Sequence, residues 1–255
     1  MPTKQKKSLH EVRFPGESVE YRDKRDELLK AEMDLRRQTE AVATQLRKLP
    51  LGGVVPRDYT FEEWDFGTGA VRKVRLSELF EDGKDTLFLY SHMFVPGKAG
   101  LPLEEGCPSC TSIIDAMDGA APHISQQINF AVVAKAPLGQ FRAHAKARGW
   151  RHARLLSSAG NTYNRDYHAE APGGDQDPMA TVFTRRGGKI HHFWSSELYL
   201  VPSDPGQDMR HVDFMWPLWS VLDRGPKGRD PEWRPELRYP PRPKQTSASR
   251  KKAPG

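Results

Sequence analysis

The alternation of apolar and polar positions predicts a long helix near the start of the chain. Between residues 20 and 49, apolar side chains recur at helical spacing and form one stripe made of Leu28, Ala31, Leu35, Val42, Leu46 and Leu49. Charged side chains fall mostly on the other faces, and Pro50 with Gly52-Gly53 is expected to end the helix. The heptad-like recurrence would suit a dimer, but packing of the stripe against a core explains it equally well. We favour core packing.

The next part of the chain reads as strands. From Tyr59 to Arg75 the alternation and a glycine turn predict a strand pair, followed by a short helical turn at Leu76–Phe80. Nearly continuous apolar runs at 85–90 and 128–134 are typical of strands that are covered on both faces. Two later runs, 179–184 and 189–194, flank Arg186-Gly187-Gly188 and predict a hairpin.

Helices are expected between these strands. An apolar face at Ile113, Ile114 and Met117 predicts a helix that Gly119 closes, and residues 141–150 predict the next one. The order strand, helix, strand, helix, strand, strand indicates an α/β thioredoxin-like fold, in which a parallel βαβ unit is completed by an antiparallel hairpin and helices flank the mixed sheet.

Three segments follow from this order. Residues 1–55 form an N-terminal extension with the amphipathic helix, and residues 56–239 form the thioredoxin-like domain, with a last helix and a wrapping tail over 203–239. Residues 240–255 are rich in proline and basic residues and are expected to be a disordered tail.

Composition narrows the class of protein. The 255 residues carry a formal net charge of +6, but much of the excess lies near the two ends of the chain, so we do not expect binding to nucleic acid. No apolar run is long enough to span a bilayer, and the polar N-terminus has no secretory h-region. With two cysteines in the whole chain, a disulfide-dense secreted scaffold is excluded. We therefore expect a cytoplasmic protein.

The two cysteines form one motif, Cys107-Pro108-Ser109-Cys110, placed after the first buried strand. A bridge across so short a loop adds little stability, since the entropic gain grows with loop length. The pair therefore indicates a redox dithiol, with Cys107 at the helix N-terminus as nucleophile and Cys110, one turn later, as resolving thiol. Two inert buried thiols, or half of a metal site, are the alternatives.

The chain resembles the bacterial DUF899 family, a thioredoxin-like group, from Arg13 to about Trp233. The matching stretches are Arg13–Ser18, Tyr21-Arg22, Leu35–Gln38, Cys107–Thr111, Val132–Pro137, Arg148–Arg151 and Asn161–Tyr167. The resemblance implies the fold and the dithiol position, and hence a thiol-disulfide oxidoreductase or a relative that has kept the residues.

The segment before the first core strand also resembles peroxiredoxins. A peroxidase of that kind needs a threonine three residues before its reactive cysteine, but Glu104 stands there before Cys107, and Cys107 itself stands there before Cys110. This departure argues against peroxide reduction.

Fold analogy also selects Pro178 as a candidate substrate contact. Thioredoxin-like folds place a cis-proline before the third strand, facing the dithiol, and Asp177-Pro178-Met179 stands ahead of such a run. A plain turn proline in trans is the alternative, since few X-Pro bonds in folded proteins are cis.

The remaining candidates have weaker patterns. His92, His191 or His192 could join the cysteines at a zinc or copper site, but adjacent strand residues point to opposite faces, so only one of the last two could ligate. His92 could instead lie near the dithiol. Asn161–Tyr167 is either a substrate-contacting loop or a turn, and the tryptophans are assigned to the core.

Two functions remain open. The first is an enzyme that exchanges a disulfide with a protein or small-molecule thiol, without a cofactor. The second is a thioredoxin-fold binding or redox-sensing module without turnover, dimeric through the helix at 20–49.

Overall fold

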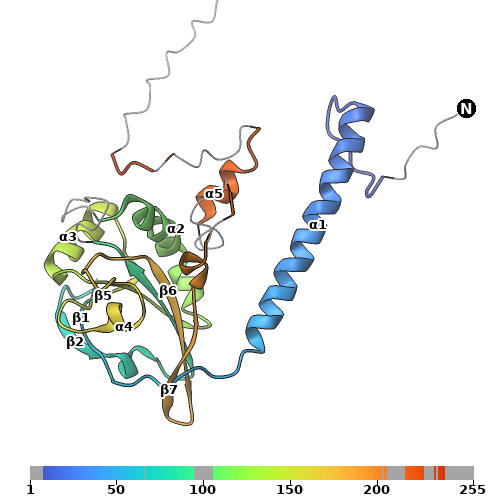
Figure 1. The fold of residues 1–255 in the computed structure, drawn as a ribbon. Coiled ribbons are helices and arrows are strands. Elements are labelled where there is room, and N and C mark those ends of the chain that lie inside the picture. Colours follow the sequence, from blue (N-terminus) through green and yellow to red (C-terminus); the bar gives the residue numbers. More distant parts are fainter. Residues whose placement is uncertain are drawn as a thin grey trace, which may run out of the picture. The chain divides into compact units, whose positions relative to one another are not determined.

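The computed structural model describes residues 8–65, 67–94, 106–202, 204–205, 216–226, 233 and 235–238. The chain divides into two compact units, Met1–Leu51 and Gly52–Gly255 (Figure 1). The expected tail at 240–255, the loop before Cys107 and Glu104 lie outside the described residues. No helix in the described part of the chain is both long enough and apolar enough to cross a membrane.

The first unit consists of helix α1, Val19–Arg47, and the segment before it. Ser18 caps the helix by accepting a hydrogen bond from the Tyr21 amide, as a serine at this position commonly does. The buried Arg22 lies beside the carboxylates of Glu17 and Asp26, which ties residue 17 to the first turns of the helix.

The helix predicted at 20–49 is thus confirmed, but the packing of its stripe is not. Leu28, Leu35 and Val42 are 54%, 66% and 52% exposed. Nothing within the described part of the first unit covers this stripe, and its packing against a core stays a prediction. Helical periodicity reports that apolar residues share a face, whereas it does not report what covers that face.

The second unit is built on one seven-stranded sheet with the strand order β2-β1-β5-β4-β3-β6-β7. The strands are β1 Thr60–Trp64, β2 Val71–Arg75, β3 Thr86–His92, β4 Asn129–Ala134, β5 Arg154–Ser157, β6 Met179–Arg186 and β7 Lys189–Ser195. Strands β3, β4 and β5 are parallel, and every other pair is antiparallel. This is the predicted thioredoxin-type core, a parallel βαβ unit completed by the β6–β7 hairpin.

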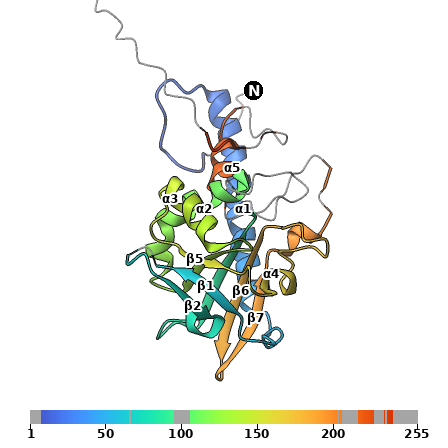
Figure 2. The ribbon, with the colours of Figure 1, turned by 90° about the vertical axis from the view of Figure 1, so that its left-hand side faces the viewer.

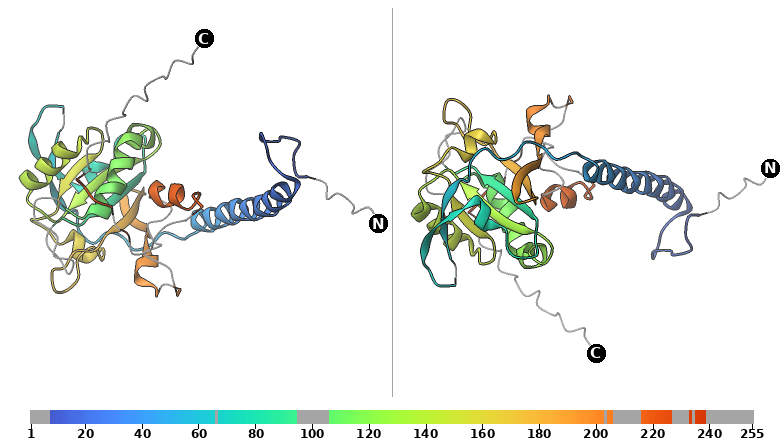
Figure 3. Two further views of the ribbon diagram at one scale, coloured as in Figure 1. Left: turned by 90° about the horizontal axis from the view of Figure 1, so that it is seen from above. Right: turned by 90° about the horizontal axis from the view of Figure 1, so that it is seen from below.

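Helices cover both faces of this sheet. The helices are α2 Pro108–Ile124, α3 Leu138–Arg148, α4 Tyr163–Asp166 and α5 Pro217–Leu222, with 3₁₀ turns η1 Leu76–Leu79 and η2 Glu197–Leu200. Figure 2 shows α2 and α3 next to each other over one face. In Figure 3, α4 (yellow) lies on one side of the strands and α2 (green) on the other.

Alternation along the central strands supplies both faces with apolar side chains. On β4, Phe130 and Val132 join the core under α2 and α3, whereas Ala131 and Val133 join the core under η1 and α4. Every residue of β4 is buried, so a strand in this position has to be apolar throughout. This explains why the continuous apolar runs marked β3 and β4 in the sequence.

The structure adds elements that the sequence pattern did not predict. Strand β5 is only four residues long, and it joins the β1–β2 hairpin to the central strands. Helix α2 continues past Gly119 to Ile124, and Asn161–Tyr167 contains the short helix α4 rather than a plain turn. Segments this short carry too few residues to reveal a period.

One buried carboxylate fixes the chain between α3 and β5. Asp118, on α2, accepts hydrogen bonds from the backbone amides of Arg151, His152 and Ala153, at 2.9 to 3.1 Å. These amides have no strand partner at this point, so the carboxylate satisfies donors that burial would otherwise leave unpaired. Helix α2 is thereby held over the sheet, with its first turn at the C-terminal end of β3.

Candidate functional site: a dithiol at the start of helix α2

Cys107 is the N-cap residue of α2, as the sequence predicted. Its backbone is extended (φ −67°, ψ 124°), and Pro108 follows at the first helical position. The Cys107 amide donates to the Met93 carbonyl (2.9 Å), and its carbonyl accepts from the Thr111 amide (2.9 Å). The side chain therefore sits where the open amides of the first turn and the positive end of the helix dipole favour a thiolate.

Cys110 lies one turn later and faces Cys107. The two cysteines approach to 3.7 Å and form no disulfide. Cys107 is 7% exposed and Cys110 only 1%, so Cys107 is the more accessible thiol. Burial raises the pKa of Cys110 well above its usual value, and the hydrogen bond and charge of Cys107 raise it further. Burial thus keeps Cys110 in its protonated thiol form.

Tyr90 on β3 lies beneath the pair. Its side chain is fully buried, and burial together with the neighbouring Cys110 raises the pKa of the phenol. The contact between the Tyr90 hydroxyl and Cys110 also lowers the pKa of that thiol. Its geometry falls short of a regular hydrogen bond, and the described residues give the Tyr90 hydroxyl no other partner. The group beneath the two cysteines is therefore the neutral hydroxyl of Tyr90, which is a weaker base than a carboxylate at the same place would be.

A buried polar chain runs from β3 to α3 behind the first turn of α2. The hydroxyl Oγ1 of Thr111 is 3.1 Å from Nε2 of His92 and 3.1 Å from Nε2 of His144. Because a hydroxyl has one proton, Thr111 can donate to only one imidazole and must accept from the other. Burial, with the nearby His144, lowers the pKa of His92 to about 3, so His92 is neutral at physiological pH.

Aromatic rings enclose this chain and exclude water from it. Phe94, Phe141 and Trp150 stand within 6 Å of the His92 ring, measured between centroids. His92 thus lies near the dithiol, which was one of the two roles open to it. As a neutral ring with a hydrogen bond to Thr111, it supports the helix start rather than supplying a charge.

Gly106 allows the chain to approach this cluster. Its φ of +65° is in the left-handed region, and a Cβ atom there would meet Cε1 of His92 at 2.5 Å and the Phe94 ring at 3.0 Å. A glycine is therefore required immediately before Cys107.

Pro178 is buried at the start of β6, in the neighbourhood expected for it. Strands β3 and β6 pair Ser91 with Met179, so continuing this register brings Pro178 opposite His92 and next to Met93, whose carbonyl binds the Cys107 amide. The Asp177–Pro178 peptide bond is trans. Of the two isomers that the sequence left open, the structure has the trans one, because a proline before the third strand does not by itself fix the isomer.

The other histidines do not join the dithiol. On β7, Nδ1 of His191 contacts the Gly52 carbonyl, and Nε2 of His192 contacts the Ser195 hydroxyl. Within the described ranges, no group of three or more His, Cys, Asp or Glu side chains is arranged to hold a metal ion.

The block Asn161–Tyr167 lies away from the cysteines. Tyr163 belongs to the core on the α4 face of the sheet, and Asp166 accepts a hydrogen bond from Tyr59. The cysteines belong to the core on the opposite face. The block therefore forms the short helix α4 on the other face of the sheet, and nothing in the described residues supports its interpretation as a substrate-contacting loop near the dithiol.

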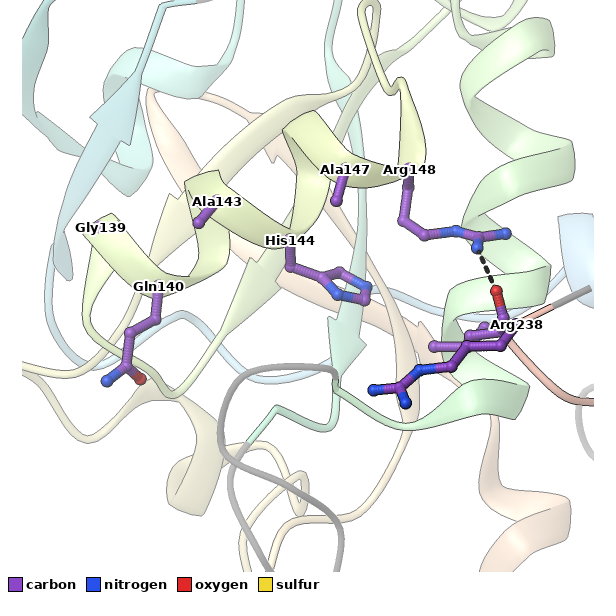
Figure 4. A pocket seen from close by; sticks show the side chains of 8 residues that line it. Gly139, Gln140, Ala143, His144, Ala147, Arg148 and Arg238 are labelled. Atoms are coloured by element: carbon purple, nitrogen blue, oxygen red, sulfur yellow. Dashed lines mark hydrogen bonds between the residues drawn. The ribbon is translucent and has the colours of Figure 1, made fainter.

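A pocket opens beside the polar chain (Figure 4). Its volume is ≈ 520 Å³, and it is lined by α3 and by the segment at 237–238, through Gly139, Gln140, Ala143, His144, Ala147, Arg148, Leu237 and Arg238. Arg148 donates to the Leu237 carbonyl at 3.2 Å, which fixes that segment beside α3. His144 belongs to both the pocket wall and the buried chain.

Sequence reasoning missed four residues of this site: Tyr90, Gly106, Thr111 and His144. Thr111 is adjacent to the motif, and Tyr90 occupies the same face of β3 as His92, so both positions were within reach of a helix and strand register. His144 is more than thirty residues from the cysteines, and no spacing signal connects it to them.

Comparison with known proteins assigns the chain to a family. Residues 11–249 match the model of a family described as "Bacterial protein of unknown function (DUF899)". No curated protein matches the sequence.

Among solved structures, the chain is similar to Enterococcus faecalis AhpC at 10% identity and a TM-score of 0.43, over 68% of this chain and 93% of that one. It is similar to a reduced 2-Cys peroxiredoxin of Plasmodium vivax at 19% identity and a TM-score of 0.44, over 65% of this chain and 95% of that one. A thioredoxin lipoprotein of Streptococcus pneumoniae, Etrx1, gives 14% identity and a TM-score of 0.36, over 62% and 98%.

Proposed function

We propose that this chain, which belongs to the DUF899 family, is a thiol-disulfide oxidoreductase in which Cys107 attacks a disulfide and Cys110 resolves it. The observation that carries the proposal is the unbonded pair at the start of α2, 3.7 Å apart, with the more exposed thiol at the N-cap. No cofactor is needed, because the electrons come from the two thiols themselves.

The cycle balances on these two residues. The Cys107 thiolate attacks one sulfur of a disulfide, forms a mixed disulfide and expels the other sulfur as a thiolate, which takes up a proton. Cys110 then loses its proton and attacks the Cys107 sulfur, which releases the second product thiol and leaves a Cys107–Cys110 disulfide. The raised pKa of Cys110 keeps it protonated until this second step. We place this cycle in the cytoplasm, with a protein or small-molecule disulfide as substrate.

A redox titration tests the proposal. Equilibration of the whole protein with glutathione buffers, followed by mass analysis of alkylated thiols, should show one two-electron couple in the range of cellular thiol pools. If the protein remains fully reduced throughout that range, the proposed oxidoreductase activity is contradicted, and the alternative of a binding or sensing module is left. The midpoint potential also sets the direction, because a strongly reducing value indicates a reductase and a high value an oxidant.

We also propose that α1 pairs with α1 of a second copy in antiparallel orientation. Five exposed side chains recur every seven residues and are symmetric about Leu35: Tyr21, Leu28, Leu35, Val42 and Leu49. Residues 20–34 contain six acidic and four basic side chains, whereas residues 36–48 contain four basic and one acidic. An antiparallel pair brings the acidic half of one helix against the basic half of the other, which a parallel pair does not.

The substitution Leu35→Lys, which places a charge at the centre of this pair, should convert the dimer to a monomer, as measured by sedimentation equilibrium. Two lysines would face each other where two leucines were expected to meet. Leu35 is exposed, so the helix itself tolerates the change. Lys30→Ala, on another face of the helix, is the control and should leave the dimer intact. A wild-type chain that sediments as a monomer contradicts the pairing.

A further inference from the structure

The Tyr90 hydroxyl is a buried polar group in contact with one of the two cysteine sulfurs. Tyr90 lies on the central strand β3, is fully buried, and belongs to the same core cluster as Cys107 and Cys110. Side chains two residues apart on a strand point to the same face, so Tyr90 shares its face with His92, whose ring contacts Thr111 on α2. Within the described residues, the Tyr90 hydroxyl has no regular hydrogen-bond partner. An unpaired buried hydroxyl destabilises the fold unless it gains a partner during the reaction.

Cys110 is surrounded by groups whose positions the fold fixes. The backbone amide of Cys107 donates to the Met93 carbonyl at 2.9 Å, which holds the first turn of α2 over the end of β3. The Cys110 side chain, which is 1% exposed, contacts the Cys107 sulfur, the Tyr90 hydroxyl and the backbone amide of Met93. Because water hardly reaches this sulfur, these groups decide how stable its charged form is.

The surrounding groups shift the pKa of Cys110 in opposite directions. Burial raises this pKa most, and Cys107 raises it further through a hydrogen bond and its charge, whereas Tyr90 and the Met93 amide lower it. In a mixed disulfide, the Cys107 sulfur is bonded to the substrate sulfur and has no negative charge. The contribution of Cys107 is then lost, while the two groups that favour a Cys110 thiolate remain. The pKa of Cys110 therefore falls at the step in which Cys110 has to lose its proton.

We propose that Tyr90 is a catalytic residue of the resolving step, in which its hydroxyl donates a hydrogen bond to the Cys110 thiolate. The inference rests on the proposed dithiol function and adds a residue to it. In this step the Cys110 sulfur attacks the Cys107 sulfur, and the bond between Cys107 and the substrate sulfur breaks. The two cysteine sulfurs end as a disulfide, and the substrate sulfur leaves as a thiolate, which takes up the proton that Cys110 has lost. Tyr90 keeps its own proton, since burial and the neighbouring Cys110 raise the pKa of the phenol.

The variant Tyr90→Phe removes the donor and keeps the ring. With the full-length protein, a mixed disulfide is formed with dithiobis-nitrobenzoate at low pH, where Cys110 is protonated, and a jump to higher pH starts the release of the coloured thiolate. A hydrogen bond to a charged group corresponds to about one to two pKa units, so the apparent pKa of this release should rise by that amount in Tyr90→Phe. Below this pKa the release should be roughly three- to tenfold slower, because the more basic thiolate is the better nucleophile and offsets part of the loss.

Tyr163→Phe is the matched control. Tyr163 is also fully buried, its hydroxyl has no regular hydrogen-bond partner within the described ranges, and it belongs to the core on the other face of the sheet. This variant should leave the pH profile of the release unchanged. Since each substitution removes an unpaired hydroxyl, neither variant should unfold at a lower urea concentration than the wild type. The first thiolate, which attack by Cys107 expels, should be released at the same rate in all three proteins.

The possible outcomes separate the role of Tyr90 from the dithiol cycle. An unchanged pH profile in Tyr90→Phe, or a rate lowered by the same factor at every pH, would overturn the role of Tyr90 and leave the cycle intact. A shift of the same size in Tyr163→Phe would show that the effect is not specific to Tyr90 and would overturn it as well. A wild type that forms the mixed disulfide but never releases the second thiolate would contradict the dithiol cycle itself, and this inference with it.

Discussion

Cys107→Ser is expected to abolish disulfide reduction, whereas Cys110→Ser is expected to stop the reaction halfway. Without the N-cap thiol there is no accessible nucleophile, since Cys110 is almost fully buried and its pKa is raised by burial. Without Cys110, the mixed disulfide on Cys107 has no internal thiol to resolve it. Incubation with a disulfide followed by mass spectrometry should show an adduct on Cys110→Ser and none on Cys107→Ser.

The two variants control for each other, because each removes a single sulfur from the same turn. Brief alkylation of the wild type should label Cys107 first, since it is the more exposed thiol and the N-cap residue. An equal adduct on both variants, or first labelling of Cys110, would reverse the assigned roles. If both variants reduce disulfides as fast as the wild type, the dithiol is not the reactive group.

Gly106→Ala is expected to cost about 2 to 5 kcal/mol of unfolding free energy, the largest stability effect we predict. A left-handed φ costs a non-glycine residue roughly 1–2 kcal/mol, and overpacking typically costs another 1–3 kcal/mol. Both apply here, because φ is +65° and the new methyl would approach Cε1 of His92 to 2.5 Å. That ring is buried and bonded to Thr111, so it cannot move away freely.

Gly83→Ala is the matched control. Its φ of +79° is equally left-handed, but nothing lies within 4 Å of the new methyl group. It should therefore show only the backbone cost, roughly 1–2 kcal/mol. Urea unfolding followed by tryptophan fluorescence measures both variants. If both variants lost the same unfolding free energy, the space next to His92 would not be tight. The close approach of the chain before Cys107 would then contribute nothing to the effect of Gly106→Ala.

The N-terminal helix and the central strands illustrate what a sequence pattern can establish. Long periodic segments predicted α1, β3 and β4, because every residue of a buried strand or every turn of an amphipathic helix adds to the same signal. Strand β5 escaped notice because four residues carry little periodicity, and its position is fixed by pairing with β1 and β4. The stripe on α1 was recognised from its period, but periodicity does not say which surface covers it.

The residues of the site likewise fall into those that the sequence predicted and those that only the folded structure revealed. Spacing identified Cys107 and Cys110, and capping rules identified their separate positions, because both depend on residues adjacent in the chain. The trans state of Pro178 and the contacts of His144 depend on residues that meet only in the folded chain.

The sequence by itself therefore determined the helix start, the dithiol and the order of the main elements, all of which follow from local chemistry. Only the tertiary structure decided that Tyr90 lies under Cys110 and that Thr111 joins His92 to His144. It likewise brought Arg238 beside α3. Each of these contacts joins segments far apart in the chain. These contacts form when the helices pack on the sheet, and no local sequence pattern indicates which side chains then meet.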